Sequence, residues 1–237
     1  MPETVTVKSA GSAMPLYESA PDGSARGAVI VIQEAFGVTD HIEDVCRRLS
    51  AAGYHAVAPH LFHRSGDPVI AYDDMQSVMP HLGQLGAEGL ESDVGATITH
   101  LEGAGFSAAR IGIVGFCMGG SVVVFAAARH ALGAAVTFYG GGVTAGRFGM
   151  PPLAELAPAL QTPWLGIFGD ADQSIPVDQV EALRDAAKNA AVPTEVVRYP
   201  EAGHGFHCDE RDSYHEAAAK DAWRRTLDWF DAHLAKT

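Results

Sequence analysis

The chain has 237 residues, of which 47% are hydrophobic and 19% charged, and a formal net charge of −13 at pH 7. That length and balance exclude a disordered chain and predict a single domain over residues 1–237, with a large core. The negative charge disfavours nucleic acid and membrane partners, and no apolar run of about 18 residues or secretory leader is present, so we expect a cytoplasmic protein.

Apolar runs along the chain predict strands that alternate with helices. Alternating stretches near residues 5–7 and 14–17 predict an antiparallel start. Continuous apolar runs predict buried strands at 28–32, 54–58, 110–114, 134–139, 164–168 and 195–199. Helical spacing predicts helices at 40–52, 90–101, 177–190 and 213–234, and a further helix is expected after Cys117. This alternation indicates an α/β fold with a mostly parallel, doubly wound sheet flanked by helices.

Local signals predict where two of the helices begin. Asp40 with Glu43, and Ser213 with Glu216, resemble capping boxes, which would start helices at Asp40 and Ser213. Between the regular elements, we expect an irregular segment with weak helical pieces at 59–89. The glycine run 140–142 and the proline-rich stretch 151–163 indicate a long surface loop that could border a site.

The most informative segment is G-F-C-M-G-G at 115–120, between an apolar strand and a helix rich in Val and Ala. This is the nucleophile-elbow pattern with cysteine in place of serine. Gly115 and Gly119 let strand and helix approach closely at a strained turn. The helix N-terminus favours a thiolate at Cys117 and offers the N–H of Met118 to an oxyanion. A structural cysteine or a phosphate-binding turn is the alternative, but the segment has no Walker lysine and does not fit G-x-G-x-x-G.

An acid and a base follow later strands, in the order that this fold requires. Asp172 lies in G-D-A-D at 169–172, after the strand 164–168, and His204 follows the strand that ends at Tyr199. His204 would be the base and Asp172 would orient it. Taken singly, Asp172 could be a helix or turn cap and His204 an ordinary loop histidine. The neighbouring Asp170 is a second candidate for the acid.

Four motifs together resemble the dienelactone hydrolase (carboxymethylenebutenolidase-like) family of the α/β-hydrolase superfamily. They are Q-E-A-F-G-V at 33–38, G-F-C-M-G-G, G-D-A-D-Q-S-I-P at 169–176 and A-G-H-G-F at 202–206. The resemblance extends from about residue 27 to 235. It implies an α/β-hydrolase fold and a triad of Cys117, His204 and Asp172 that cleaves an ester or lactone through a thioester.

The resemblance also implies a role for Glu34. The family's glutamate at this motif position contacts the resting thiol and helps to generate the thiolate when substrate arrives. A carboxylate beside a cysteine disfavours the thiolate, so its withdrawal would let His204 take the proton. The alternative is a solvated loop carboxylate. The same loop should supply the second oxyanion donor, the N–H of Ala35.

The chain departs from the family pattern at Cys208, where the dienelactone-cleaving members carry an arginine that holds the substrate carboxylate. Arg64 and Arg211 are candidate replacements from other loops. Without that arginine, we expect no strong preference for an anionic lactone over neutral short-chain esters. The expected pocket is apolar, lined by aromatic residues near the motifs: Phe36, Phe62, Tyr139 and Phe206.

The remaining cysteines and histidines indicate no further chemistry. Cys46 is expected in the core, and three scattered cysteines without a CxxC pair indicate neither a disulfide framework nor zinc. We therefore predict no metal and no cofactor, with a small ester or lactone as the partner of a monomer or small homo-oligomer. The alternatives are a general short-chain carboxylesterase and a weakly catalytic binding or redox-sensing protein in which Cys117 is oxidised.

Overall fold

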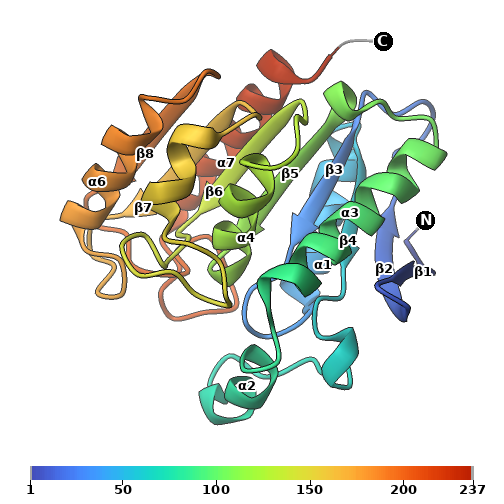
Figure 1. The fold of residues 1–237 in the computed structure, drawn as a ribbon, viewed down its shortest axis with the longest axis horizontal. Helices are drawn as coiled ribbons and strands as arrows, with labels where there is room; N and C mark the ends of the chain where they lie inside the picture. The colour runs from blue at the N-terminus through green and yellow to red at the C-terminus, as the bar shows by residue number, and fades with distance from the viewer. Residues whose placement is uncertain (1, 236–237) are drawn as a thin grey trace.

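The computed structural model describes residues 2–235 and contains an eight-stranded sheet in the order β1-β2-β4-β3-β5-β6-β7-β8 (Figure 1). The strands are β1 (Glu3–Ser9), β2 (Ser12–Ser19), β3 (Ala28–Ile32), β4 (His55–Pro59), β5 (Ile111–Phe116), β6 (Ala134–Phe138), β7 (Trp164–Gly169) and β8 (Thr194–Tyr199). β2 pairs antiparallel with β1 and β4, and the other pairs are parallel. The predicted antiparallel start and α/β-hydrolase fold are confirmed.

Helices cover both faces of the sheet. They are α1 (Asp40–Ala51), α2 (Met75–Leu82), α3 (Ala87–Gly103), α4 (Met118–Ala127), α5 (Leu153–Leu156), α6 (Val177–Ala187) and α7 (Glu216–His233). In Figure 1, α3, α4 and α6 lie in front of the sheet, α1 and α7 lie behind it, and α2 lies apart from it. No helix within residues 2–235 combines the length and apolar character needed to cross a bilayer.

The helix α1 begins at Asp40 as predicted, but both predicted capping residues are wrong by one or two positions. The N-cap of α1 is Thr39, one residue earlier than predicted, and its hydroxyl accepts the N–H of Ile42 at 3.5 Å. The N-cap of α7 is His215, two residues after Ser213, and its Nδ1 accepts the N–H of Ala218 at 3.2 Å. An N-cap must have a non-helical backbone and an acceptor facing the first turn, and both residues satisfy that condition.

The proline-rich stretch that was predicted as a loop contains α5 and a 3₁₀ turn at 157–159. Leu153 and Leu156 are buried, so this segment packs against the body of the protein. Tertiary contacts have ordered a segment whose prolines suggest an irregular chain. The segment between β6 and α5, residues 139–152, keeps the predicted loop character.

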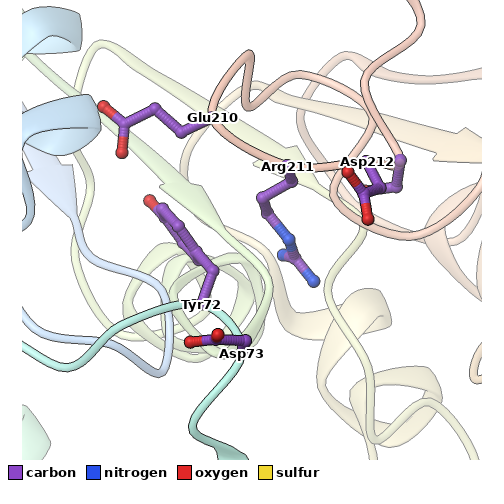
Figure 2. A pocket seen from close by; sticks show the side chains of 6 residues that line it. Tyr72, Asp73, Glu210, Arg211 and Asp212 are labelled. Carbon is purple, nitrogen blue, oxygen red and sulfur yellow. The ribbon is translucent and has the colours of Figure 1, made fainter.

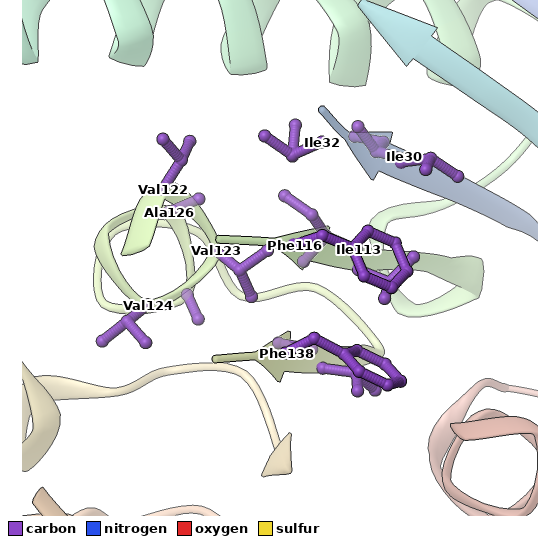
Figure 3. Packing of buried hydrophobic residues seen from close by; sticks show 14 of the residues in the cluster. Ile30, Ile32, Ile113, Phe116, Val122, Val123, Val124, Ala126 and Phe138 are labelled. Atoms are coloured by element: carbon purple, nitrogen blue, oxygen red, sulfur yellow. The ribbon is translucent and has the colours of Figure 1, made fainter. Parts of the chain in front are cut away.

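The centre of the sheet is buried on both faces. Every residue of β3, β5, β6 and β7 is buried, as is every residue of α4. Figure 3 shows this packing: Ile30 and Ile32 of β3 and Phe138 of β6 lie beside β5, next to Val122 and Val123 of α4. Each fully buried side chain of this size contributes about 1.5–3 kcal/mol to the hydrophobic free energy of folding. The strand and helix that flank Cys117 therefore form a rigid platform.

Candidate active site

The four candidate catalytic residues lie at the carboxyl ends of parallel strands. Glu34 follows β3, Cys117 follows β5, Asp172 follows β7 and His204 follows β8. Ligands of open α/β sheets bind at this edge, because the strand ends and the helix N-termini meet there. The topology thus brings together residues that are up to 170 positions apart.

Cys117 has a strained backbone between β5 and α4. Its φ is 54° and its ψ is −118°, in a region that residues other than glycine rarely adopt. Its N–H donates to the carbonyl of Phe138 at 3.1 Å, which anchors the turn to β6. The residue is partly exposed, whereas all six residues of β5 before it are buried. The elbow therefore presents the thiol at the surface of the platform.

Three glycines are required around this elbow because backbones approach closely. A Cβ at Gly115 would lie 2.4 Å from the carbonyl oxygen of Gly119, and a Cβ at Gly119 would lie 2.5 Å from that of Gln33. A Cβ at Gly120 would lie 2.6 Å from the carbonyl oxygen of Phe138. The elbow is thus packed against β3 on one side and β6 on the other, with no space for side chains.

Asp172 and His204 form a well-aligned pair. Asp172 is buried, and its Oδ2 lies 2.7 Å from Nδ1 of His204. Its Oδ1 accepts from the N–H of Ser174 at 2.8 Å, the hydroxyl of Ser174 at 2.6 Å and the N–H of Ile175 at 3.2 Å. Burial acts to raise the pKa of Asp172, but the hydrogen bonds from His204 and Ser174 outweigh it and lower that pKa. The carboxylate is thus held ionised and in one orientation.

The environment of His204 favours its protonated form. Burial acts to lower the pKa of His204, but Asp172 and the neighbouring Cys117 raise it to about 10. Because Nδ1 is engaged by Asp172, Nε2 is the ring nitrogen left for the thiol. The hydroxyl of Ser174 also lies 3.3 Å from Nδ1. This arrangement favours an imidazolium at His204, beside the sulfur of Cys117.

Asp170, the other acid of G-D-A-D, is bound elsewhere. Its Oδ1 accepts from Nε of Arg198 at 2.7 Å, and its Oδ2 from Nη2 of the same arginine at 2.8 Å. This bidentate pair ties the end of β7 to β8. The structure therefore brings Asp172, and not Asp170, to His204.

Glu34 is buried beside an arginine. Its Oε1 lies 3.3 Å from Nη1 of Arg211, while its Oε2 has no hydrogen-bond partner among residues 2–235. Burial raises the pKa of Glu34, although Arg211 and His204 act to lower it. No hydrogen bond joins Glu34 to the Cys117 thiol in the described chain. Glu34 is thus a buried carboxyl with unused hydrogen-bonding capacity, rather than a solvated loop acid.

Tyr139 brings a second unused polar atom to the site. It follows β6 with a φ of 38°, and its ring centroid lies 5.1 Å from that of His204. Its hydroxyl is buried and has no hydrogen-bond partner within residues 2–235. Burial raises the pKa of Tyr139, and Glu34 adds to that rise. The phenol is therefore a neutral hydrogen-bonding group close to His204, and not only an apolar wall.

The cavity that contains the thiol differs from the expected one. It has a volume of about 330 Å³ and is lined by Cys117, His204, Gly141, Gly142, Ala145, Arg147, Ser174 and Ile175. The predicted aromatic residues Phe36, Phe62, Tyr139 and Phe206 are buried and do not line it. They fill the core because their rings pack on neighbours, as Phe206 does on Tyr139 with centroids 5.4 Å apart. The glycine run was expected to border a site, but Arg147 and Ser174 were not anticipated.

The candidate replacements for the missing arginine have separate partners. Arg64 binds Asp93 with both terminal nitrogens, at 2.8 and 2.9 Å, and lies in a different cavity, so it does not reach the thiol. Arg211 is paired with Glu34. Cys208 is fully buried, and burial raises the pKa of its thiol to about 11.

A second cavity lies on the other side of Arg211. It has a volume of about 610 Å³ and is lined by Tyr72, Asp73, Glu210, Arg211, Asp212 and Ser213 (Figure 2). The guanidinium carbon of Arg211 lies 5.5 Å from the ring centroid of Tyr72 and 5.6 Å from that of Phe36. Arg211 thus forms a wall between this acidic cavity and Glu34. Within residues 2–235, no group of three or more His, Cys, Asp or Glu side chains is arranged to hold a metal ion.

Known proteins resemble this chain over nearly its whole length. The model of the dienelactone hydrolase family matches residues 14–234. A Salmonella typhimurium protein named "Putative carboxymethylenebutenolidase" is 42% identical, over 98% of this chain and 87% of its own. A carboxymethylenebutenolidase of Rhodococcus opacus is 27% identical, over 93% of this chain and 87% of its own. The crystal structure of "Putative Dienelactone Hydrolase" from Klebsiella pneumoniae superposes with a TM-score of 0.91 at 38% identity, covering 98% of this chain and 99% of that one.

Proposed function

Because the chain belongs to the dienelactone hydrolase family and is a carboxylic ester hydrolase, we propose that it cleaves a small ester or lactone through Cys117, His204 and Asp172. The observation that carries this proposal is the 2.7 Å contact between Asp172 and His204 in a site where His204 and Cys117 line one cavity. The strained elbow supports it, since backbone strain of this kind is concentrated at functional sites.

The first half of the reaction forms a thioester. The Cys117 thiolate attacks the carbonyl carbon, a C–S bond forms, and the carbonyl oxygen takes the negative charge. The N–H of Met118, the first residue of α4, has no acceptor within its helix and can bind that oxygen. The N–H of Ala35, in the turn after β3, is the second donor. The C–O bond then breaks, and the leaving oxygen takes the proton from Nε2 of His204.

The second half releases the acid. His204, now neutral, takes a proton from water as the water oxygen attacks the thioester carbonyl. The C–S bond breaks, the carboxylic acid leaves, and the thiolate again lies beside a protonated His204. Asp172 stays hydrogen-bonded to Nδ1 throughout and stabilises the imidazolium that is present before acylation and forms again during deacylation. In a lactone, the leaving oxygen stays attached to the product.

Glu34 is proposed to control the state of the thiol. A charged carboxylate beside Cys117 disfavours the thiolate, and an ion pair with Arg211 draws that charge away. The buried Oε2 without a partner supports this role, because an unsatisfied buried carboxylate oxygen is costly unless a ligand or a movement engages it.

The test is hydrolysis of 4-nitrophenyl acetate combined with mass spectrometry of the intact protein. Cys117→Ala should lower kcat by about 10⁴-fold or more, because removal of a triad nucleophile has that effect, and His204→Ala should show a parallel loss. The wild type should carry a transient acetyl group on Cys117. Cys46→Ala is the matched control, since that cysteine is buried on α1, and it should keep its activity.

Two outcomes would contradict the proposal. Substantial turnover by folded Cys117→Ala would mean that another group is the nucleophile. A wild-type protein that hydrolyses neither esters nor lactones, but whose Cys117 is converted to a sulfenic acid by dilute peroxide, would favour the redox-sensing alternative.

A further inference from the structure

Arg147 is held in place by an unusual turn in the loop between β6 and α5. Its carbonyl oxygen accepts the N–H of Met150 at 2.9 Å, and the two residues between them, Phe148 and Gly149, have φ values of 54° and 69°. Two successive positive φ values are the signature of a type I′ turn, in which a phenylalanine is strained. The loop thus maintains one backbone conformation at Arg147 against a local energetic cost.

The glycine run makes room for the arginine side chain. A Cβ at Gly141 would lie 2.9 Å from Nη1 of Arg147, and a Cβ at Gly142 would lie 3.0 Å from its Cδ. The side chain therefore lies across the bare backbone of these two glycines, with its guanidinium carbon 4.9 Å from the ring centroid of Phe148. All three residues, Gly141, Gly142 and Arg147, line the cavity that contains Cys117 and His204.

No acid of the described chain neutralises the charge of Arg147. Within residues 2–235, no Asp or Glu oxygen lies within 4.0 Å of its guanidinium nitrogens. The other arginines near the site each have an acid: Arg211 has Glu34, Arg64 has Asp93 and Arg198 has Asp170. In a chain with a net charge of −13, a guanidinium in a cavity beside the nucleophile without an acidic partner is available to bind an anion.

We propose that Arg147 forms an anion-binding subsite beside the triad and selects esters or lactones that carry a carboxylate. Its planar guanidinium can bind both oxygens of a carboxylate, and the cavity of about 330 Å³ suits a small acid. This subsite lies on the β6 side of Cys117, away from the β3 side where Glu34 and Arg211 are paired. The inference rests on the proposed function, and it reverses the expectation from sequence that an anionic substrate is not strongly preferred over neutral esters.

The experiment compares matched pairs of substrates that differ by one charge. The first pair, mono-4-nitrophenyl glutarate and its methyl ester, places the carboxylate on the acyl group. The second pair, 4-acetoxybenzoate and its methyl ester, places it on the leaving group. The ratio of kcat/KM for the anion to kcat/KM for the neutral ester should exceed one in at least one pair. Arg147→Gln should lower that ratio by about 10- to 150-fold, the range for a charge-assisted hydrogen bond to a carboxylate.

Three further variants distinguish recognition from a change in total charge. Arg147→Lys should recover only part of the ratio, because an ammonium cannot bind both oxygens in the same plane. Gly141→Ala keeps the charge but would displace the guanidinium of Arg147, so it should also lower the ratio of kcat/KM for the anion to that for the neutral ester. Arg224→Gln makes the same change of charge on α7, where Arg224 is exposed and paired with Asp221 and Asp228. This variant should leave kcat/KM unchanged for both the anionic and the neutral ester.

Hydrolysis of the neutral esters distinguishes a failure of the Arg147 subsite from a failure of the proposed hydrolase function. Hydrolysis of the neutral esters that depends on Cys117, with no preference for the anion in either pair, would overturn the subsite and leave the triad intact. A preference for the anion that persists in Arg147→Gln would also overturn it, because another cation would then be responsible. Loss of neutral-ester hydrolysis in wild type would instead count against the proposed function.

Discussion

The two sides of Cys117 differ in how completely their polar atoms are paired. On the β7 and β8 side, both oxygens of Asp172 are engaged, one by His204 and the other by Ser174 and Ile175. By contrast, Oε2 of Glu34, on the β3 side, is buried without a partner in the described chain, as is the hydroxyl of Tyr139, which follows β6.

This difference separates a rigid part of the site from a part that is poised to change. A fully paired network keeps its geometry during reaction, so the Asp172–His204 side resembles a preorganised acid–base device. Unpaired buried atoms raise the free energy of the resting state and can be satisfied by a substrate or by a movement of a side chain. Variants on the first side should therefore affect the rate of chemistry, and variants on the second should affect activation of the thiol.

The largest effect is expected on the rigid side, at Asp172. Asp172→Asn keeps the shape but favours the wrong imidazole tautomer and removes support for the imidazolium, so kcat should fall by about 10⁴-fold with a near-normal melting temperature. Asp170→Asn is the control. It loses only a partly exposed ion pair with Arg198, which contributes about 0–1 kcal/mol to stability, and it should stay active. The reverse result would show that the wrong carboxylate has been assigned.

A smaller effect is expected at Ser174, a positioning residue. Ser174→Ala removes the hydroxyl that donates to Asp172 at 2.6 Å but keeps the backbone donors, so kcat should fall by about 3- to 10-fold. Because this hydroxyl helps to lower the pKa of Asp172, its loss should move the acidic limb of the pH profile to higher pH. Ser174→Thr, which keeps a hydroxyl, should recover both properties. A profile that does not move would limit Ser174 to a packing role.

On the poised side, Glu34→Gln should change the reactivity of the thiol. Removing a neighbouring negative charge eases thiolate formation, so iodoacetamide should label Cys117 faster, by up to about tenfold, the change that one pKa unit produces. Turnover should decrease, because the control of the thiol is lost. Glu210→Gln is the control, since Glu210 lies in the second cavity. Equal labelling rates and equal turnover between about pH 6 and 9 would exclude a role for Glu34 at the thiol.

The smallest expected effect is on stability, and it also involves Glu34. Burial raises the pKa of Glu34 in the folded protein, so this carboxyl ionises first in the unfolded chain, as the pH rises through its ordinary pKa of 4.5. The folded state therefore loses stability above that pH, and Glu34→Gln should remove the loss. We expect its melting temperature to rise by about 2 to 4 °C at neutral pH, as about 1 kcal/mol would produce, with no rise near pH 4. A lower melting temperature at neutral pH would show that the ion pair with Arg211 outweighs the burial.

The sequence by itself determined those features that depend on local spacing. Gly115 and Gly119 flank Cys117 because strand and helix must approach closely at an elbow, and the structure has carbonyl oxygens at the positions that a Cβ would need. The continuous apolar runs similarly determined the strands, because a strand covered on both faces has no polar side. The helix caps could not be placed to the residue, since Thr39 and His215 depend on backbone angles that a capping pattern does not specify.

Only the tertiary structure decided how the charges are paired. G-D-A-D offers two acids, and the contact of Asp170 with Arg198, 28 residues away, leaves Asp172 for His204. Glu34 meets Arg211 across 177 residues, while Arg147 has no acidic partner within residues 2–235 and lines the cavity that contains the thiol. Electrostatic interactions act over a few ångströms in space and not along the chain, so no spacing in the sequence reveals which of these arginines is free to bind a substrate.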